Sequence, residues 1–173
     1  MQKREDALPE VDIALDNAIG RIQSFGKAYS NLADTQGEGA TVMMRAYLDD
    51  LVDGIATGVL PDNVTIARGL DDCTLPREKA VAIGLFINEA MTNSANYAFP
   101  DGRAGEVGIA FAVDGDAWSV RVSDDGVGTA AADATIASTG LGARLLNAFA
   151  AQANAVYELE TGAGGRVLHL RSQ

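Results

Sequence analysis

Residues 83–99 read Ile-Gly-Leu-Phe-Ile-Asn-Glu-Ala-Met-Thr-Asn-Ser-Ala-Asn-Tyr-Ala-Phe and place a carboxylate and several amides along an otherwise apolar helix. Glu89 and Asn93 are four residues apart, and Asn96 and Tyr97 lie three and four residues beyond Asn93. Because residues at these spacings share one face of a helix, all four side chains can face a single ligand. An acid and an amide so placed could orient a proton acceptor and hold a hard cation. Taken alone, the pattern is also that of a solvated helix face.

Two glycine clusters follow this helix. The first, Asp124-Asp125-Gly126-Val127-Gly128, comes after a segment that alternates like a strand, and the second, Ser138-Thr139-Gly140-Leu141-Gly142, opens a segment with a helical pattern. Glycines let backbone N–H groups approach phosphates, and a helix N-terminus adds a favourable dipole, so the second cluster predicts a triphosphate cradle. The first offers an acidic acceptor for an exocyclic amine such as that of adenine. Each cluster by itself is also compatible with a structural loop.

The ordered combination of these motifs resembles a known ATP-binding domain. An asparagine-bearing helix, two strands, Asp-x-Gly-x-Gly, a short linker, Gly-x-Gly and a second helix occur in that order. This order is similar to the GHKL (HATPase) superfamily, which includes sensor histidine kinases and gyrase-type ATPases. Residues 88–102, Asn-Glu-Ala-Met-Thr-Asn-Ser-Ala-Asn-Tyr-Ala-Phe-Pro-Asp-Gly, look like the N box of sensor histidine kinases of the HisKA_2 or HWE type. The similarity extends from about residue 41 to the C-terminus and, to a lesser degree, over residues 10–33.

The resemblance implies a role for each matching residue. Glu89 corresponds to the general base, Asn93 to the magnesium ligand and Asp124 to the acid that reads adenine. ATP and Mg²⁺ are therefore the implied cofactors, and they suit phosphoryl transfer, which needs positioning and charge compensation more than covalent help. The other implied nucleotide contacts are Asn96 and Tyr97 on the helix, Gly126 and Gly128 in the first cluster, and Thr139, Gly140, Leu141 and Gly142 in the second. The sequence has no Gly-x-x-x-x-Gly-Lys-Ser/Thr, which argues against a P-loop enzyme.

Two positions depart from the pattern of this family. Asn96 stands where the family often has a lysine, and the loss of that cation is expected to weaken phosphate binding or slow transfer. Arg166 follows the Gly162-Ala163-Gly164-Gly165 turn, where relatives often carry a small hydroxyl residue. Arg166 could partly replace the missing cation, but we interpret it as a solvated strand residue.

The phosphoacceptor is the larger departure. Kinases of this type carry their substrate histidine on a dimerisation helix in a stretch such as His-Arg-x-Lys-Asn-Asn, which this sequence lacks. The sole histidine, His169, lies in a stretch whose alternation predicts a strand, with Leu168 and Leu170 on the opposite face. The chain is therefore not expected to phosphorylate itself on histidine. The resemblance implies a phosphoacceptor histidine helix that is missing in cis or supplied in trans, and a response regulator receiver domain whose aspartate accepts the phosphoryl group next.

The N-terminal segment carries an apolar stripe with helical spacing. Its members follow steps of four and three, a pattern that requires a helical partner; they are Val11, Leu15, Ala18, Ile22, Phe25, Tyr29 and Leu32. Residues 9–33 are therefore predicted as a helix that resembles the second half of a dimerisation hairpin and could form a homodimer. The alternative is that this helix folds back onto its own domain.

Composition limits the class of protein. The chain has 173 residues, enough for one substantial core, and 47% of them are hydrophobic. Its net charge of −11 argues against a nucleic-acid partner, because a phosphate backbone would be repelled. No apolar run is long enough to span a bilayer and the first residues are not a signal peptide, so we expect a cytoplasmic domain with no membrane span in this chain. Cys73 is the only cysteine, which excludes a disulfide framework.

Local patterns predict the order of the elements. Helices are expected at about 9–33, 41–57, from Pro76 to about 98, and 140–153, and strands at about 63–69, 106–113, 117–123, 154–161 and 166–172. Residues 129–139 would form a short lid over ATP. The fold class is α+β, a two-layer α/β sandwich of the Bergerat type, with helices on one face of a mixed, largely antiparallel sheet. We assign residues 1–57 to a helical remnant of a dimerisation and phosphotransfer domain, and residues 58–173 to the ATP-binding catalytic domain.

Three functions remain open at this point. The leading interpretation is the ATP-binding catalytic domain of a two-component sensor histidine kinase, which transfers the γ-phosphoryl group to a histidine outside this chain. Asn96 and the missing histidine also fit a nucleotide-binding but inactive scaffold. A serine kinase of the anti-sigma-factor type shares the same nucleotide fold and is the third.

Overall fold

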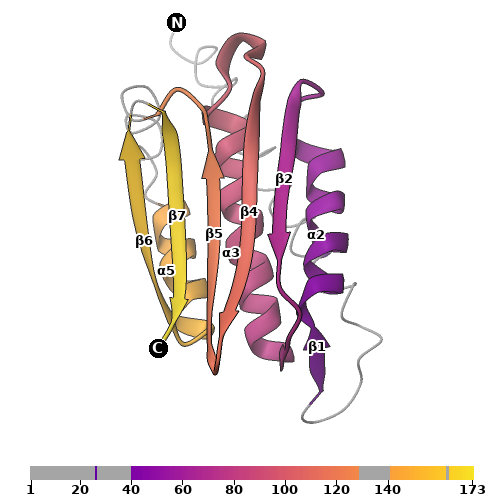
Figure 1. The fold of residues 1–173 in the computed structure, drawn as a ribbon. Coiled ribbons are helices and arrows are strands. Elements are labelled where there is room, and N and C mark those ends of the chain that lie inside the picture. The colour runs from indigo at the N-terminus through magenta and orange to yellow at the C-terminus, as the bar shows by residue number, and fades with distance from the viewer. Residues whose placement is uncertain (1–25, 27–39, 129–140, 163) are drawn as a thin grey trace, which may run out of the picture.

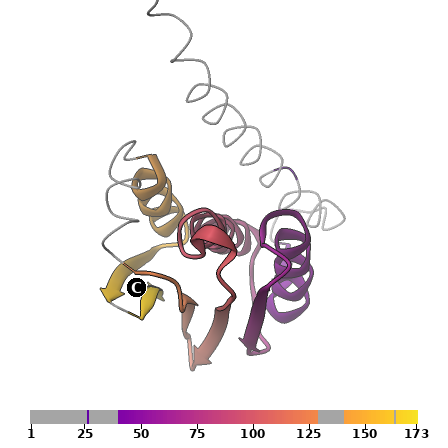
Figure 2. The ribbon, with the colours of Figure 1, turned by 90° about the horizontal axis from the view of Figure 1, so that it is seen from above.

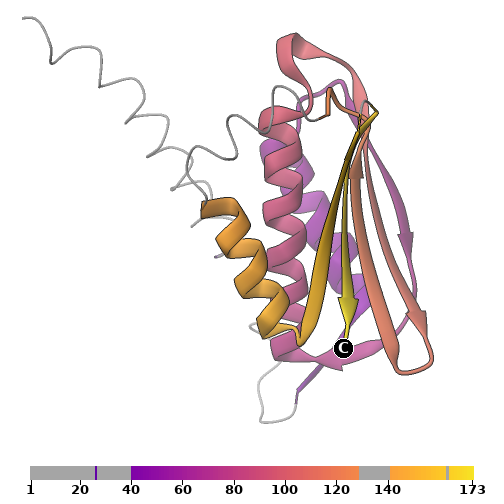
Figure 3. The same ribbon diagram turned by 90° about the vertical axis from the view of Figure 1, so that its left-hand side faces the viewer.

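The computed structural model describes residue 26 and residues 40–128, 141–162 and 164–173. These form two layers, with a five-stranded sheet on one side and three helices on the other (Figure 1, Figure 3). The helices are α2 (Met44–Val59), α3 (Arg77–Tyr97) and α5 (Leu141–Gln152), with one 3-10 turn, η1 (Pro100–Gly102). The strands are β1 (Thr41–Met43), β2 (Val64–Leu70), β3 (Thr74–Pro76), β4 (Gly105–Asp114), β5 (Ala117–Asp124), β6 (Ala155–Gly162) and β7 (Gly165–Ser172). The two-layer α/β sandwich predicted from the sequence is confirmed.

The large sheet is mixed and mainly antiparallel, as predicted. Its strand order is β2-β4-β5-β7-β6, in which β2 and β4 run parallel and all other neighbours are antiparallel. The predicted hairpin of β4 and β5 is present, with Gly115 at a φ of 61° in its turn. At the other end of β5, Asp124 lies opposite Arg166 of β7. The start of β7 therefore lies beside the end of β5.

The hydrophobic core lies between the sheet and α3, which is the middle helix of the three (Figure 2). Every residue of α3 from Ala80 to Met91 is buried, because α2 and α5 flank this helix and the sheet lies against it. The sheet contributes alternate residues to this core, namely Val107, Ile109 and Phe111 of β4, Trp118, Val120 and Val122 of β5, and Leu168 and Leu170 of β7. The buried polar residues of α3 therefore do not belong to a solvated helix face; they are Asn88, Glu89, Asn93 and Ser94.

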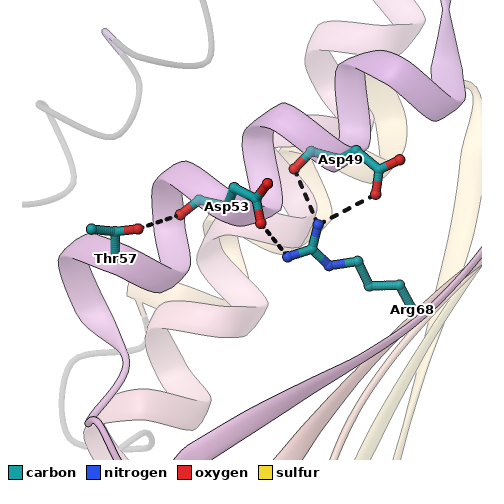
Figure 4. A network of polar contacts seen from close by, with 4 residues as sticks. All are labelled: Asp49, Asp53, Thr57 and Arg68. Carbon is teal, nitrogen blue, oxygen red and sulfur yellow. Dashed lines mark hydrogen bonds and ion pairs between the residues drawn. The ribbon is translucent and has the colours of Figure 1, made fainter.

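Arg68 of β2 holds α2 against the edge of the sheet (Figure 4). Its Nη1 lies 3.3 Å from Asp49 Oδ1, and its Nη2 donates a hydrogen bond to the carboxylate of Asp53. The backbone carbonyl of Asp53 in turn accepts a hydrogen bond of 2.9 Å from Thr57 Oγ1. The hydrogen bond to Asp53 raises the pKa of Arg68. Since these side chains are partly exposed, each pair contributes at most about 1 kcal/mol and mainly orients α2.

The helix predicted over residues 41–57 needs a correction. Residues 41–43 form the short strand β1, which pairs antiparallel with β3, and the helix begins at Met44 and extends to Val59. The backbone N–H of Met44 donates a hydrogen bond of 2.9 Å to the carbonyl of Cys73, next to β3. The strand depends on a partner about thirty residues away, so a local sequence pattern could not predict it, and β3 itself was also missed.

Several predictions concern residues outside the described part of the chain. These are the helix over 9–33 with its dimer interface and the lid over 129–139. The predicted domain boundary after residue 57 falls within α2, whose buried face contributes to the same core as α3. The assignment of residues 1–57 to a former dimerisation domain stays a prediction. None of the helices in the described ranges combines the length and the apolar character that a membrane span requires.

Candidate functional site

Glu89, Asn93 and Ser94 bring polar groups into the core on the second half of α3. Glu89 is fully buried, and Asn93 and Ser94 are almost so. Asn93 Nδ2 donates a hydrogen bond of 3.3 Å to Glu89 Oε1, as expected for residues one helical turn apart. Buried polar side chains are costly unless they are partnered, and this hydrogen bond gives each of the two a partner. The predicted acid and amide are therefore side by side.

The two remaining candidates on α3 lie differently. Asn96 is exposed and Tyr97 is half-buried, both in the last turn of the helix. No hydrogen bond from either side chain joins them to Glu89 or Asn93 in the described part of the chain. Their roles as nucleotide contacts stay predictions.

Gly142 brings the second glycine cluster to the acid and amide pair. A Cβ added at Gly142 would lie 3.1 Å from Glu89 Oε1 and 3.6 Å from Asn93 Nδ2. The first of these distances is tighter than an ordinary Cβ contact, so glycine eases the approach of the first turn of α5 to α3. The positive end of the α5 dipole, which begins at Leu141, therefore lies near these two residues. The candidates Thr139 and Gly140 fall outside the described residues.

Asp124 forms the second polar centre, at the end of β5. Its Oδ2 accepts a hydrogen bond of 2.8 Å from Ser94 Oγ, and its Oδ1 accepts one of 3.2 Å from the backbone N–H of Gly126. Arg166 Nε donates to Oδ2 at 3.3 Å. Ser94 follows Asn93 directly in the sequence, so the two centres are neighbours on α3.

The glycines of the first cluster allow close backbone contacts around Asp124. A Cβ at Gly126 would lie 2.4 Å from the Cβ of Ala98, and the N–H of Val127 donates to the carbonyl of Ala98 at 3.0 Å. Gly128 has a φ of 68°, and a Cβ there would lie 1.9 Å from the carbonyl oxygen of Gly162. The cluster is therefore held between the end of α3 and the turn that joins β6 to β7, and the prediction that these glycines shape a pocket remains to be tested with ligand.

The interpretation of Arg166 as a solvated strand residue is wrong. Its side chain is only 8% exposed and pairs with the Asp124 carboxylate, which is 2% exposed. The reason lies in strand parity, because Arg166, Leu168 and Leu170 share the face of β7 that points to the helices. The same alternation that placed His169 on the outer face therefore contained the signal for Arg166.

Ser94 is the residue that sequence reasoning missed. Its contact with Asp124 joins positions 30 residues apart, through the packing of α3 on β5. The only local signal was a hydroxyl residue in an otherwise apolar helix, which is weak because serine is common in helices. Asn88 is also buried, yet no described residue forms a hydrogen bond with its side-chain amide.

The arrangement suits a ligand that brings its own charge and its own metal-binding atoms. In the described ranges no three His, Cys, Asp or Glu side chains converge as metal ligands. Mg²⁺ bound to phosphates ordinarily keeps several waters and takes only one or two ligands from the protein. Asn93 donates its amide nitrogen to Glu89, and its amide oxygen is of the ligand type that such an ion accepts.

Comparisons with known proteins agree with this fold. The family model of the histidine kinase-like ATPase domain matches residues 63–171. The histidine kinase domain from the Erythrobacter litoralis EL346 blue-light activated histidine kinase is similar with a TM-score of 0.76 and 23% identity, over 88% of this chain and 72% of that chain. The E. litoralis EL346 kinase itself gives 0.72 and 21%, over 94% of this chain and 49% of that one, so this chain spans about half its length.

A more distant solved structure has the same fold. The mycobacterial sensor histidine kinase MprB gives a TM-score of 0.60 and 13% identity, over 78% of this chain and 97% of that chain. No curated protein matches the sequence. At these identities the solved structures establish the shared fold.

Proposed function

The chain belongs to the family of histidine kinase-like ATPase domains, and we propose that it binds ATP with Mg²⁺ as the catalytic domain of a two-component sensor histidine kinase. The observation that carries this proposal is the proximity of two polar centres on α3. One is the Glu89 and Asn93 pair beneath Gly142, and the other is the buried Asp124 with Ser94. We infer that the first centre lies beside the phosphates of ATP and the second beside its adenine ring.

In this proposal, different residues bind the nucleotide and promote the transfer. Asp124 accepts a hydrogen bond from the exocyclic amine of adenine, and the N–H groups at the start of α5 approach the phosphates. Asn93 would hold Mg²⁺ through its amide oxygen, and the ion, when bound, neutralises phosphate charge. The unprotonated imidazole nitrogen of the substrate histidine bonds to the γ-phosphorus as the bond to ADP breaks, and Glu89 accepts the proton of the other ring nitrogen.

We infer that the phosphoryl acceptors are not part of this sequence, whose one histidine is His169. His169 lies on β7 facing away from the helices, 3.9 Å from Glu160, so we propose that the substrate histidine is on a helix supplied in cis or in trans. A response regulator receiver domain would accept the phosphoryl group next. We also keep cytoplasmic location and a homodimer through residues 9–33 as parts of this proposal.

Binding of ATP is expected to depend on Mg²⁺ through Asn93. The chain carries a net charge of −11, so an unscreened triphosphate is repelled. Isothermal titration should give an ATP affinity at least about tenfold weaker in EDTA than in Mg²⁺. Asn93→Ala should lower the Mg-ATP affinity to about the EDTA value and leave the EDTA value unchanged.

Asn147→Ala is the matched control for this titration. Asn147 is an exposed helical asparagine of α5 whose amide donates to the carbonyl of Ala143. The Asn147→Ala variant should bind Mg-ATP with the same affinity as the unmodified chain. Equal ATP affinity with and without Mg²⁺ in the unmodified chain would refute the assignment of Asn93.

Transfer is tested with γ-labelled ATP and isolated dimerisation domains of the HisKA_2 type, followed by receiver domains. We expect acid-labile phosphohistidine on the dimerisation domain. Glu89→Gln keeps the size of the side chain, and it should reduce transfer by about 100-fold or more with little change in ATP affinity. Binding without transfer to any acceptor would favour the inactive scaffold, which the exposed Asn96 in place of a lysine also suits. Acid-stable phosphoserine would favour the anti-sigma-factor type.

A further inference from the structure

The hydrogen bonds of Asp124 leave one direction for a ligand. A carboxylate accepts about four hydrogen bonds, two at each oxygen. Oδ2 receives Ser94 Oγ at 2.8 Å and Arg166 Nε at 3.3 Å, which occupies both of its sites. Oδ1 receives the N–H of Gly126 at 3.2 Å and, among the described residues, retains one site. An incoming donor is therefore directed to Oδ1.

Arg166 is built into this position by the sheet. It lies opposite Asp124 in the pairing of β5 with β7, and Gly165 beside it has a φ of 113°. A Cβ at Gly165 would lie 1.8 Å from the carbonyl oxygen of Asp124, so the two strands touch at this point. The backbone contacts between β5 and β7 therefore fix the guanidinium of Arg166 next to the carboxylate of Asp124.

The charge of Arg166 has a specific consequence for the carboxylate. An ionised carboxylate that loses its hydration is unstable unless a positive group lies beside it. The guanidinium of Arg166 has donors and no acceptor, so at Oδ2 of Asp124 it can only donate. Because Arg166 contacts Asp124, it lies at the end of β5. It therefore does not take the place of the lysine that the family often has where this chain has Asn96.

We propose that Arg166 is the positioning residue that makes the pocket selective for a 6-aminopurine over a 6-oxopurine nucleotide. This inference rests on the proposed nucleotide site. With Arg166 and Ser94 on Oδ2, Oδ1 presents only an acceptor to the 6-position of the base. The amine of adenine donates to it, whereas the carbonyl oxygen of hypoxanthine or guanine faces it with a second acceptor, which repels and leaves both oxygens unpartnered. Without Arg166, Oδ2 keeps only Ser94 as a donor, and the carboxylate is no longer held with the open site of Oδ1 toward the base.

The test compares the affinities for ATP and ITP with Mg²⁺, by titration of the whole chain. ITP carries hypoxanthine and differs from ATP at the 6-position and in the proton on N1 that accompanies it. The unmodified chain should prefer ATP by about 30-fold or more. Arg166→Met keeps an unbranched side chain as far as the position of Nε but removes the guanidinium charge and donors. The ratio of the ATP affinity to the ITP affinity should fall by about tenfold.

Arg171→Met is the matched control. Arg171 lies on the same strand, its side chain is half-exposed and it pairs with Glu158, so this variant loses the same charge without touching Asp124. The ratio of its ATP affinity to its ITP affinity should equal that of the unmodified chain. Arg166→Lys keeps the charge but not the Nε donor, and its ratio should fall by about threefold; it carries the test if Arg166→Met does not fold.

A variant that loses only packing or stability would bind ATP and ITP with equally weakened affinities. The ratio of the two affinities therefore separates a positioning role from a structural one. An unchanged ratio in a folded Arg166 variant, or an unmodified chain that binds ATP and ITP equally, would overturn the inference while nucleotide binding stands. An unmodified chain that binds neither nucleotide would overturn the proposed function as well.

Discussion

Asp124→Ala is expected to weaken Mg-ATP binding by about 100-fold or more. The substitution removes the acceptor at Oδ1 for the adenine amine, and truncating one member of a buried charged pair costs about 2–5 kcal/mol in binding. Isothermal titration of the variant and the unmodified chain measures the effect. Asp116→Ala, in the exposed turn between β4 and β5, removes the same charge and should not change the affinity. Equal affinities for Asp124→Ala and the unmodified chain would refute the assignment of the base site.

A second variant separates the loss of the pocket from the loss of the fold. Asp124→Ala leaves the buried Arg166 without its carboxylate, which is expected to destabilise the chain by about 3–5 kcal/mol. The double variant Asp124→Ala/Arg166→Met removes both charges and should recover much of this stability in urea unfolding. It should still fail to bind ATP. If the double variant recovered ATP binding too, the carboxylate would have a structural role only.

Gly165→Ala is expected to lower the free energy of unfolding by about 3 kcal/mol or more. The φ of 113° is a conformation that residues with a Cβ rarely adopt, and the added Cβ would lie 1.8 Å from the Asp124 carbonyl oxygen. The strands β5 and β7 would have to separate at the base of the site. Urea unfolding monitored by circular dichroism measures this change.

Gly164 is a sharp control because it is the preceding residue. A Cβ at Gly164 meets nothing within 4 Å, and its backbone is not in the left-handed region. Gly164→Ala should change the free energy of unfolding by less than about 0.5 kcal/mol. A loss in Gly164→Ala as large as that in Gly165→Ala would show that the turn, and not the contact with Asp124, sets the stability.

Local pattern was sufficient for most of the architecture. The helix that became α3, the β4 and β5 hairpin and the last two strands all follow from apolar periodicity and turn residues in the sequence. The end positions differ by one or two residues, which is the usual uncertainty of helix and strand ends. The strands β1 and β3 were missed because each is three residues long and depends on the other across the chain.

The site was predicted in part. Glu89 and Asn93 could be paired from their spacing, since a helix fixes which residues are neighbours one turn apart. Asp124 was singled out by its glycine neighbours. Arg166 was misinterpreted, because a charged residue on a terminal strand is ordinarily solvated and the alternation with Leu168 and Leu170 was given too little weight.

The sequence by itself determined the two-layer α/β fold, the acid and amide on α3 and the glycines around the second centre, because helix and strand periodicities act over short stretches. Tertiary structure alone decided that Ser94 and Arg166 meet on Asp124 and that Gly142 lies against Glu89. These contacts join residues tens of positions apart through sheet register and helix packing. No local pattern encodes such distances, so only the assembled core shows them.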